Sequence, residues 1–169
     1  MPAFQQEVLR LLTLYGDVRL LQEEDAPVLQ PFLMLFEDFF WTCEQTLPDA
    51  KELLRTHPPQ KDPLLDKGVF GFYENNQLYG LVDLVKDYPQ NGTWTIGYLL
   101  VHPDHQRAHK STSLVRALES LTSAGMRILR CIVQKENHRA LSFWQRSGFI
   151  PVPTSHTDIT VCKKPMPLP

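Results

Sequence analysis

The strongest constraint on the fold is the order of patterns between residues 94 and 133. A β-rich run ends at Val101, a polar loop follows, a helical pattern runs from Ser111 to Gly125, and a second β-rich run covers 127–133. A strand that is followed by a helix and a second strand of the same sheet returns parallel to the first. The segment therefore predicts an α/β fold with a parallel crossover.

The residues before this crossover predict antiparallel strands. The β-rich runs 69–73 and 78–85 flank a polar turn at 74–77, which is typical of a hairpin. A second turn at 88–92 leads into the strand that ends at Val101. The other expected elements are helices at 4–14, 25–36, 48–56 and 138–147, a strand at 18–21, and a final hairpin of 150–152 with 157–162.

Composition limits the class of protein. A length of 169 residues, 43% of them hydrophobic, predicts one domain spanning 1–169 with a sizeable core. The net charge of −2 and the pI near 6.3 provide no general attraction to nucleic acid or to an acidic membrane. No apolar run reaches the ~18 residues of a membrane span, and no signal peptide is recognisable. We therefore expect a cytoplasmic protein with neither nucleic acid nor membrane as a partner.

The cysteines and histidines predict no metal site. Cys43, Cys131 and Cys162 are odd in number and lack paired spacing, which favours reduced thiols over disulfides or zinc. The histidines show no spacing that is typical of metal ligands.

The polar loop after Val101 is a candidate anion site, because the backbone N–H groups at a helix start can donate to phosphate oxygens. Its residues are Gln106, Arg107, Ala108, His109, Lys110 and Ser111. Arg107 and Lys110 add positive charge. The alternative is a polar turn that only caps the helix through Ser111.

A second motif, NHRALSFWQRSGF, begins at Asn137 and ends at Phe149. Together with the strand, loop and helix before it, this motif resembles motifs A and B of the GNAT superfamily of N-acetyltransferases. The resemblance covers about 69–149 and implies a mixed, twisted sheet of six or seven strands flanked by helices. It also implies transfer of acetyl from acetyl-CoA to a primary amine, on a small molecule or a protein terminus. No metal is implied, and a homodimer is left open.

The resemblance assigns cofactor contacts to the first strand of the crossover and to both motifs. The backbone of Leu99, Leu100 and Val101 would pair with pantetheine, the loop 106–111 would bind the pyrophosphate, and Asn137 and Trp144 would lie beside the cofactor. This chain departs from the family at two loop positions that are usually glycine or alanine.

Those two positions hold His109 and Ser111. Histidine tolerates a positive φ better than branched residues do, so we expect the loop to form. Many family members have a tyrosine, which protonates the departing CoA thiolate, where this chain has Trp144. An indole cannot act as that acid, so we expect Trp144 to pack or to donate a hydrogen bond.

The general base must also differ, because Thr95 stands where the family often has an acidic residue. Asp83, among apolar neighbours on the preceding strand, is one candidate, and Tyr98 is another. The alternative for Asp83 is a residue on a solvent-facing side of the strand.

By the same resemblance, the acceptor pocket would include Glu37 and Trp41, where an acid beside an aromatic ring suits a cationic amine. An amphipathic helix end explains these two residues equally well. The rival function is a non-catalytic acyl-CoA-binding or interaction domain, which the residues His109, Ser111 and Trp144 favour.

Overall fold

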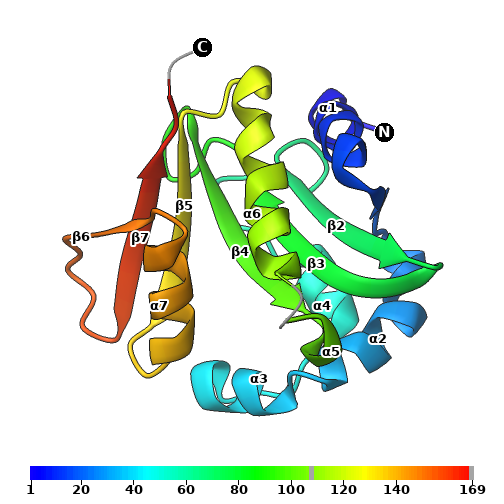
Figure 1. Cartoon of the computed structure of the whole chain (residues 1–169), viewed down its shortest axis with the longest axis horizontal. Coiled ribbons are helices and arrows are strands. Elements are labelled where there is room, and N and C mark those ends of the chain that lie inside the picture. Colours follow the sequence, from blue (N-terminus) through cyan, green and yellow to red (C-terminus); the bar gives the residue numbers. More distant parts are fainter. Residues whose placement is uncertain (107–108, 168–169) are drawn as a thin grey trace.

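The computed structural model describes residues 1–106 and 109–167. Within these ranges one mixed sheet has the strand order β1-β2-β3-β4-β5-β7-β6 (Figure 1). Its strands are β1 (Asp17–Leu20), β2 (Lys67–Glu74), β3 (Gln77–Val85), β4 (Thr93–Val101), β5 (Ile128–Gln134), β6 (Ile150–Val152) and β7 (Ile159–Pro165). The pair β4–β5 is parallel and the other pairs are antiparallel. The predicted α/β sheet of six or seven strands, with its parallel crossover, is confirmed.

Helices cover both faces of this sheet (Figure 1). One face carries α1 (Ala3–Leu12), α6 (Lys110–Glu119) and α7 (His138–Arg146), and the other carries α2 (Ala26–Met34), α3 (Glu37–Glu44) and α4 (Ala50–Arg55). The short helix α5 (Pro103–Gln106) follows β4, and 3₁₀ turns lie at Thr13–Tyr15, Glu23–Asp25 and Ser120–Ala124. Two apolar layers therefore enclose the central strands.

The side chains of β3 alternate between these two layers. Val82 and Leu84 pack in the layer under α1 and α6, and Leu81 packs in the layer under α2 to α4. The N-terminal helix, whose role the sequence did not reveal, belongs to the first layer, where the Phe4 ring meets the edge of Trp94 with 5.3 Å between centroids. Covering on both faces keeps β3 rigid, which matters because this strand carries Asp83.

Besides small shifts of element limits and the short helix α5, the structure differs from the sequence-based expectation at α3 and at β7. Residues Glu37–Glu44 form the separate helix α3, where we expected only a segment between helices. The strand β7 continues to Pro165 instead of ending at Cys162, because it pairs with β5 along its whole length. Both differences arise from tertiary packing, which overrides weak local preferences.

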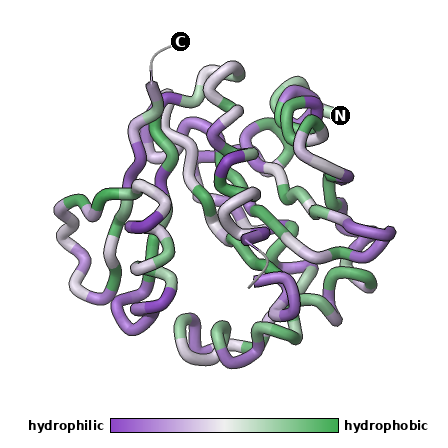
Figure 2. The backbone as a smooth tube through the Cα atoms, viewed as in Figure 1, coloured by the Kyte–Doolittle hydropathy of each residue, from purple (hydrophilic) through white to green (hydrophobic). Residues whose placement is uncertain are grey.

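The hairpin of β2 and β3 closes with a tight turn. Asn75 and Asn76 have φ values of 50° and 62°, the left-handed conformation that two-residue hairpin turns require. Figure 2 shows the tip of this hairpin as a hydrophilic end on largely hydrophobic strands.

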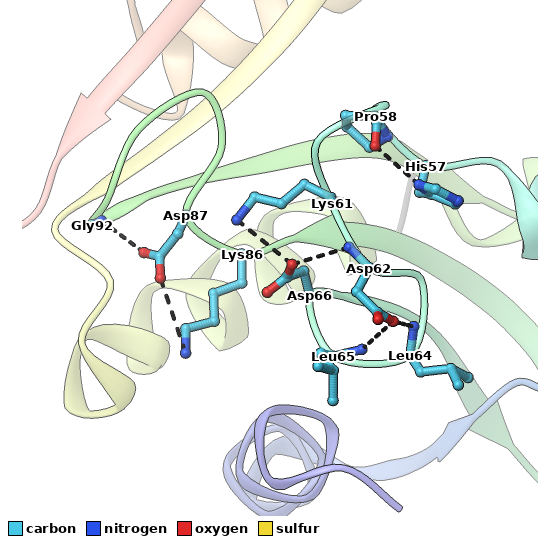
Figure 3. A network of polar contacts seen from close by, with 10 residues as sticks. All are labelled: His57, Pro58, Lys61, Asp62, Leu64, Leu65, Asp66, Lys86, Asp87 and Gly92. Carbon is cyan, nitrogen blue, oxygen red and sulfur yellow. Dashed lines mark hydrogen bonds and ion pairs between the residues drawn. The ribbon is translucent and has the colours of Figure 1, made fainter.

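The loop 56–66 leads into β2 and is held by polar contacts (Figure 3). Asp62 Oδ1 accepts hydrogen bonds from the backbone nitrogens of Leu64 and Leu65, at 2.7 and 3.2 Å. Asp66 lies 3.8 Å from the ammonium of Lys61. These contacts fix the chain immediately before the first residue of β2.

Candidate active site

The strands β4 and β5 separate halfway along their length. Thr93–Ile96 pairs with Ile128–Cys131, and beyond Ile96 the two strands diverge (Figure 1). Gly97 is the cause: Asp83 of β3 faces Tyr98 while the next residue, Leu84, faces Ile96, so Gly97 is an extra, bulged residue on β4. The bulge bends β4 away from β5, so the end of β4 pairs only with β3 and its backbone groups on the side of β5 are released.

A cleft of about 1340 Å³ opens at this separation. Drug-sized ligands occupy pockets of roughly 300–1000 Å³, so the cleft has room for a nucleotide-sized cofactor and a second substrate. On the side of α6 and α7 its lining carries one acid, Glu119, which pairs with Lys164, and the further basic residues Arg116, Arg139 and Arg146. On the side of α3 its lining carries acids and aromatic rings, namely Asp38, Glu44, Asp83, Phe36, Phe39 and Tyr98. The cleft is therefore polarised, with a basic end and an acidic end.

Asp83 lies in this cleft beside the bulge of β4 and is only 6% exposed. Its Oδ2 atom is 3.2 Å from the Nζ atom of Lys67, and that ammonium also donates to the carbonyls of Leu53 and Thr56. The other oxygen, Oδ1, is buried and has no hydrogen-bond partner among the residues that the structure describes. One carboxylate oxygen is thus anchored, and the other keeps its capacity to accept a hydrogen bond.

Burial controls the protonation of Asp83. Desolvation raises the pKa of its carboxyl group to about 6, and the positive charge of Lys67 opposes that rise. A carboxylate with this pKa is mostly ionised at neutral pH and is more basic than an exposed aspartate. Both properties suit a general base.

Tyr98 lies directly opposite Asp83 on β4, and its hydroxyl donates to Glu44 Oε1 at 2.6 Å. Burial and the Glu44 carboxylate raise the pKa of Tyr98 well above its usual range. The phenol therefore keeps its proton at neutral pH. Of the two candidates for the base, the electrostatics favour Asp83, and Tyr98 is suited to donating a hydrogen bond.

The candidate phosphate loop lies between α5 and α6, with Arg107 and Ala108 outside the described residues. His109 adopts a left-handed conformation, with φ 57° and ψ 18°, as the glycine-like position of the loop requires. Gln106, His109 and Ser111 line the cleft. The first turn of α6 thus starts beside the cleft, where its N–H groups and helix dipole favour an anion.

Lys110 points elsewhere. Its Nζ atom lies 2.7 Å from Glu74 Oε1 and 4.9 Å from the ring centroid of Tyr79, on the side of the β2–β3 hairpin. It is not among the residues that line the cleft. The structure therefore ties Lys110 to the hairpin, where it supports the loop without facing the cleft.

Gln106 connects the two sides of the cleft. Its Nε2 atom donates to the Val101 carbonyl at 2.9 Å, and its Oε1 atom accepts from Arg139 Nη2 of α7, also at 2.9 Å. Leu99, Leu100 and Val101 all line the cleft along the released end of β4. The structure thus brings together the strand end, the loop and α7, as the cofactor assignment requires.

Asn137 and Trp144, the two residues of the second motif that were predicted to lie beside the cofactor, both line the cleft. Asn137 Oδ1 accepts from the backbone nitrogen of Ala140 at 3.1 Å and so caps α7. Trp144 is buried, with its ring 4.7 Å from Phe149 and 5.1 Å from Phe143 between centroids. Its packing position agrees with the expected non-acidic role.

Glu37 and Trp41 do not line the cleft, and Trp41 is 57% exposed. They occupy the outer side of α3, whereas Asp38 and Glu44 of the same helix face the cleft. The two residues predicted for the acceptor pocket thus lie outside the cleft lining, on a helix that the sequence analysis did not anticipate.

Sequence reasoning also missed Lys67 and Arg116. Arg116 shares a helical face with Thr112, Val115 and Glu119, all of which line the cleft. That spacing could have revealed Arg116. Nothing local distinguishes Lys67 from a surface lysine at a strand start.

Replacing His109 by glycine tests the loop. Glycine adopts positive φ without the roughly 1 kcal/mol cost that other residues incur, so His109→Gly is expected to raise the free energy of unfolding by about that amount. Acetyl-CoA affinity should be equal or higher, because the imidazole no longer restricts access. Denaturant unfolding and calorimetric titration measure the two effects. A large loss of affinity would show that the imidazole itself contacts the ligand.

A sheet that separates at a parallel pair, beside a loop and a helix N-terminus, is the architecture of an acyl-CoA-dependent acyltransferase. A model of the acetyltransferase (GNAT) family matches residues 32–149. The chain therefore belongs to the GNAT family of acetyltransferases, whose enzymes use acetyl-CoA as the acyl donor. The predicted family and the acyltransferase class are confirmed.

Solved structures agree with this assignment, although no curated protein matches the chain by sequence. An acetyltransferase from Thermus thermophilus is 26% identical, with a TM-score of 0.74, over 89% of this chain and 96% of that one. The PaiA N-acetyltransferase from Thermoplasma acidophilum, solved with coenzyme A, is 18% identical, with a TM-score of 0.63, over 88% and 98% of the two chains. The ribosomal-protein-S18-alanine N-acetyltransferase from Escherichia coli is 16% identical, with a TM-score of 0.65, over 90% and 95%. The last two show the shared fold alone.

No helix within residues 1–106 and 109–167 is long and apolar enough to cross a membrane. The same residues contain no group of three or more His, Cys, Asp or Glu side chains placed to hold a metal ion.

Proposed function

We propose that the protein transfers the acetyl group of acetyl-CoA to the primary amine of a cationic acceptor, a small molecule or a protein terminus, with Asp83 as the general base. The observation that carries this proposal is the buried Asp83 carboxylate in the cleft, with one oxygen anchored by Lys67 and the other without a partner among the described residues. A buried polar atom of this kind is costly unless a ligand satisfies it.

Acetyl-CoA supplies the activated acetyl thioester, and the basic end of the cleft fits its phosphates. The released backbone of Leu99 to Val101 would hold the pantetheine amides, and the loop 106–111 with the start of α6 would hold the pyrophosphate. Arg116 and Arg139, which line the same end, add positive charge. This placement is supported by the predicted cofactor residues that line the cleft, which are Leu99, Leu100, Val101, Gln106, His109, Ser111, Asn137 and Trp144.

The acidic end suits the acceptor. Asp38 and Glu44 of α3 line it together with the rings of Phe36 and Phe39. Carboxylates attract a cation into the cleft, and aromatic faces stabilise it there. This end lies beside Asp83, where the acceptor nitrogen would have to lose a proton.

The chain contributes positioning and proton transfer. The bond between the acceptor nitrogen and the acetyl carbon forms as the bond from that carbon to the CoA sulfur breaks, and the nitrogen passes its proton to Asp83, directly or through a water molecule. The departing thiolate takes a proton from solvent, since Trp144 cannot supply one. Holding both substrates in one cleft lowers the barrier further.

Calorimetric titration with acetyl-CoA and CoA, followed by turnover assays against a panel of amines, tests this function. We expect acetyl-CoA and CoA both to bind. Turnover should be faster with amines that carry a second positive charge than with amines whose only ionisable group is the reacting amine. Binding without turnover against the panel would support the non-catalytic domain instead, and absence of binding would contradict both functions.

A charge reversal locates the cofactor. Arg116→Glu is expected to weaken acetyl-CoA binding roughly 10-fold, because it places a negative charge beside the phosphates. Arg10→Glu is the matched control, since Arg10 is an exposed residue of α1 that pairs with Glu7 and does not line the cleft. Equal affinities for the two variants would contradict this placement of the cofactor.

A further inference from the structure

Lys67 is buried to an unusual degree for a lysine. It is the first residue of β2 and is 2% exposed, whereas lysines are almost never fully buried unless they are paired. An ammonium group has three donor positions, and three oxygens surround this one, on Leu53, Thr56 and Asp83. The three donor positions of the ammonium are therefore matched by three oxygens.

Two of these contacts do not depend on Asp83. The Leu53 carbonyl, 2.7 Å from Nζ, and the Thr56 carbonyl both belong to the end of α4, where the last turn of the helix leaves carbonyls free to accept. The negative end of the helix dipole also favours a cation there. The helix thus fixes the ammonium, and the ammonium in turn fixes Asp83.

We propose that Lys67 is a positioning residue that keeps the Asp83 carboxylate ionised and holds it beside the β4 bulge with Oδ1 directed to the acceptor amine. The inference rests on the proposed function of Asp83 as the base. Lys67 occupies Oδ2 at 3.2 Å and leaves Oδ1 without a partner among the described residues. The proton that leaves the amine would therefore go to Oδ1.

The surroundings explain why Asp83 needs a cation. The other charged or titratable residues that line this side of the cleft are Tyr98 of β4, Tyr88 before it, His57 of the loop after α4, and Asp38, Cys43 and Glu44 of α3. None of the α3 side chains is a cation. Tyr98 is neutral at neutral pH and Glu44 would repel a second carboxylate. A buried carboxyl group without a cation stays protonated, so only Lys67 among these groups supports the ionised base throughout the neutral range.

The direct test is titration of the Asp83 carboxyl group by NMR, in the wild type and in Lys67→Met. Methionine matches the length of the lysine stem without its charge. Loss of the ammonium should raise the Asp83 pKa by about one pH unit or more. Lys86→Met is the matched control, because Lys86 follows β3, is partly exposed and lies outside the cleft lining. It should leave the titration unchanged.

Kinetics supply a second readout. In Lys67→Met the acid side of the pH–rate profile should move to higher pH, so that kcat at pH 7 falls roughly 2-fold for a pKa shift of about one pH unit and roughly 10-fold for a shift of about two. The rate should recover on raising the pH, while the KM for acetyl-CoA changes little. A purely structural role would lower activity at every pH. If Lys67→Met does not fold, Lys67→Gln, which keeps polar donors, replaces it in both measurements.

The outcomes separate the two proposals. If the pKa of Asp83 is the same in Lys67→Met, or in Lys67→Gln, as in the wild type, the proposed role of Lys67 is wrong, whatever the activity of Asp83 variants. If the pKa of Asp83 rises in the Lys67 variant but Asp83→Asn is fully active, Lys67 does keep the carboxylate ionised and Asp83 is not the general base.

Discussion

Replacing Asp83 by asparagine is expected to lower kcat by roughly 100- to 10,000-fold, the range that general base catalysis contributes. Asparagine preserves the shape of the side chain and removes its basicity. The carboxamide can still accept from Lys67 through its oxygen, so the cleft should keep its form and acetyl-CoA affinity should change little. Steady-state kinetics with the best amine of the panel and calorimetric titration measure these two quantities.

The pH profile gives this prediction a specific form. Because burial raises the pKa of Asp83 to about 6, the wild-type rate should fall as the pH drops below about 6, where the carboxyl group becomes protonated and can no longer accept. Asp83→Asn should lose that dependence. Asp17→Asn is the control, since Asp17 is an exposed acid of the edge strand β1 that pairs with Arg19. Full activity of Asp83→Asn would move the role to Tyr98, to water or to the acids of α3.

The parts of the fold that the sequence predicts well are those with a strong local pattern. The hairpin around 74–77 and the crossover from Val101 to β5 both follow from alternation, turn residues and helical spacing, which depend on neighbours in the chain. The expected strand and helix limits differ from the structure by a few residues. The helix α3 was missed because its single buried position, Phe40, leaves no apolar stripe to detect.

The active site is less predictable because its contacts join distant residues. Tyr98 and Glu44 are 54 positions apart and meet only through the packing of α3 on the sheet. Lys67 meets Asp83 through the register of β2 on β3, which pairs Val69 with Asp83, and the end of α4 supplies two further oxygens for its ammonium. The burial of Asp83, in contrast, follows from apolar residues on both faces of β3, and it rules out the solvent-facing alternative.

The loop shows how a departure from a family pattern can keep the geometry of the family. His109 replaces a residue that is usually glycine, yet it adopts the left-handed conformation that glycine would supply. The fold around the loop, with Lys110 tied to Glu74 on one side and Gln106 tied to Arg139 on the other, holds the backbone in place. Fixed ends of this kind compensate for a less favourable residue between them.

The second large effect is expected at Gly97, the bulged residue of β4. A Cβ atom at this position would lie 2.8 Å from Asp83 Oδ2 and 3.1 Å from its carboxyl carbon, closer than atoms of the two side chains can approach. Asp83 is held by Lys67, so Gly97→Ala must either break that ion pair or shift the bulge. Both changes move the base by a large fraction of an ångström, and displacements of about 1 Å cost on the order of 100-fold in rate.

Gly97→Ala is therefore expected to lower kcat by roughly 10- to 100-fold and to change the NMR titration of Asp83, with the chain still folded. Gly80→Ala is the matched control. Its Cβ would meet a side-chain carbon of Leu114 at 3.0 Å, on the α6 side of β3 and away from Asp83. That flexible side chain can yield by a few tenths of an ångström, so only stability should change. Wild-type kcat and an unchanged Asp83 titration in Gly97→Ala would show that the carboxylate is not confined by the bulge, and the base would then have to act from another position.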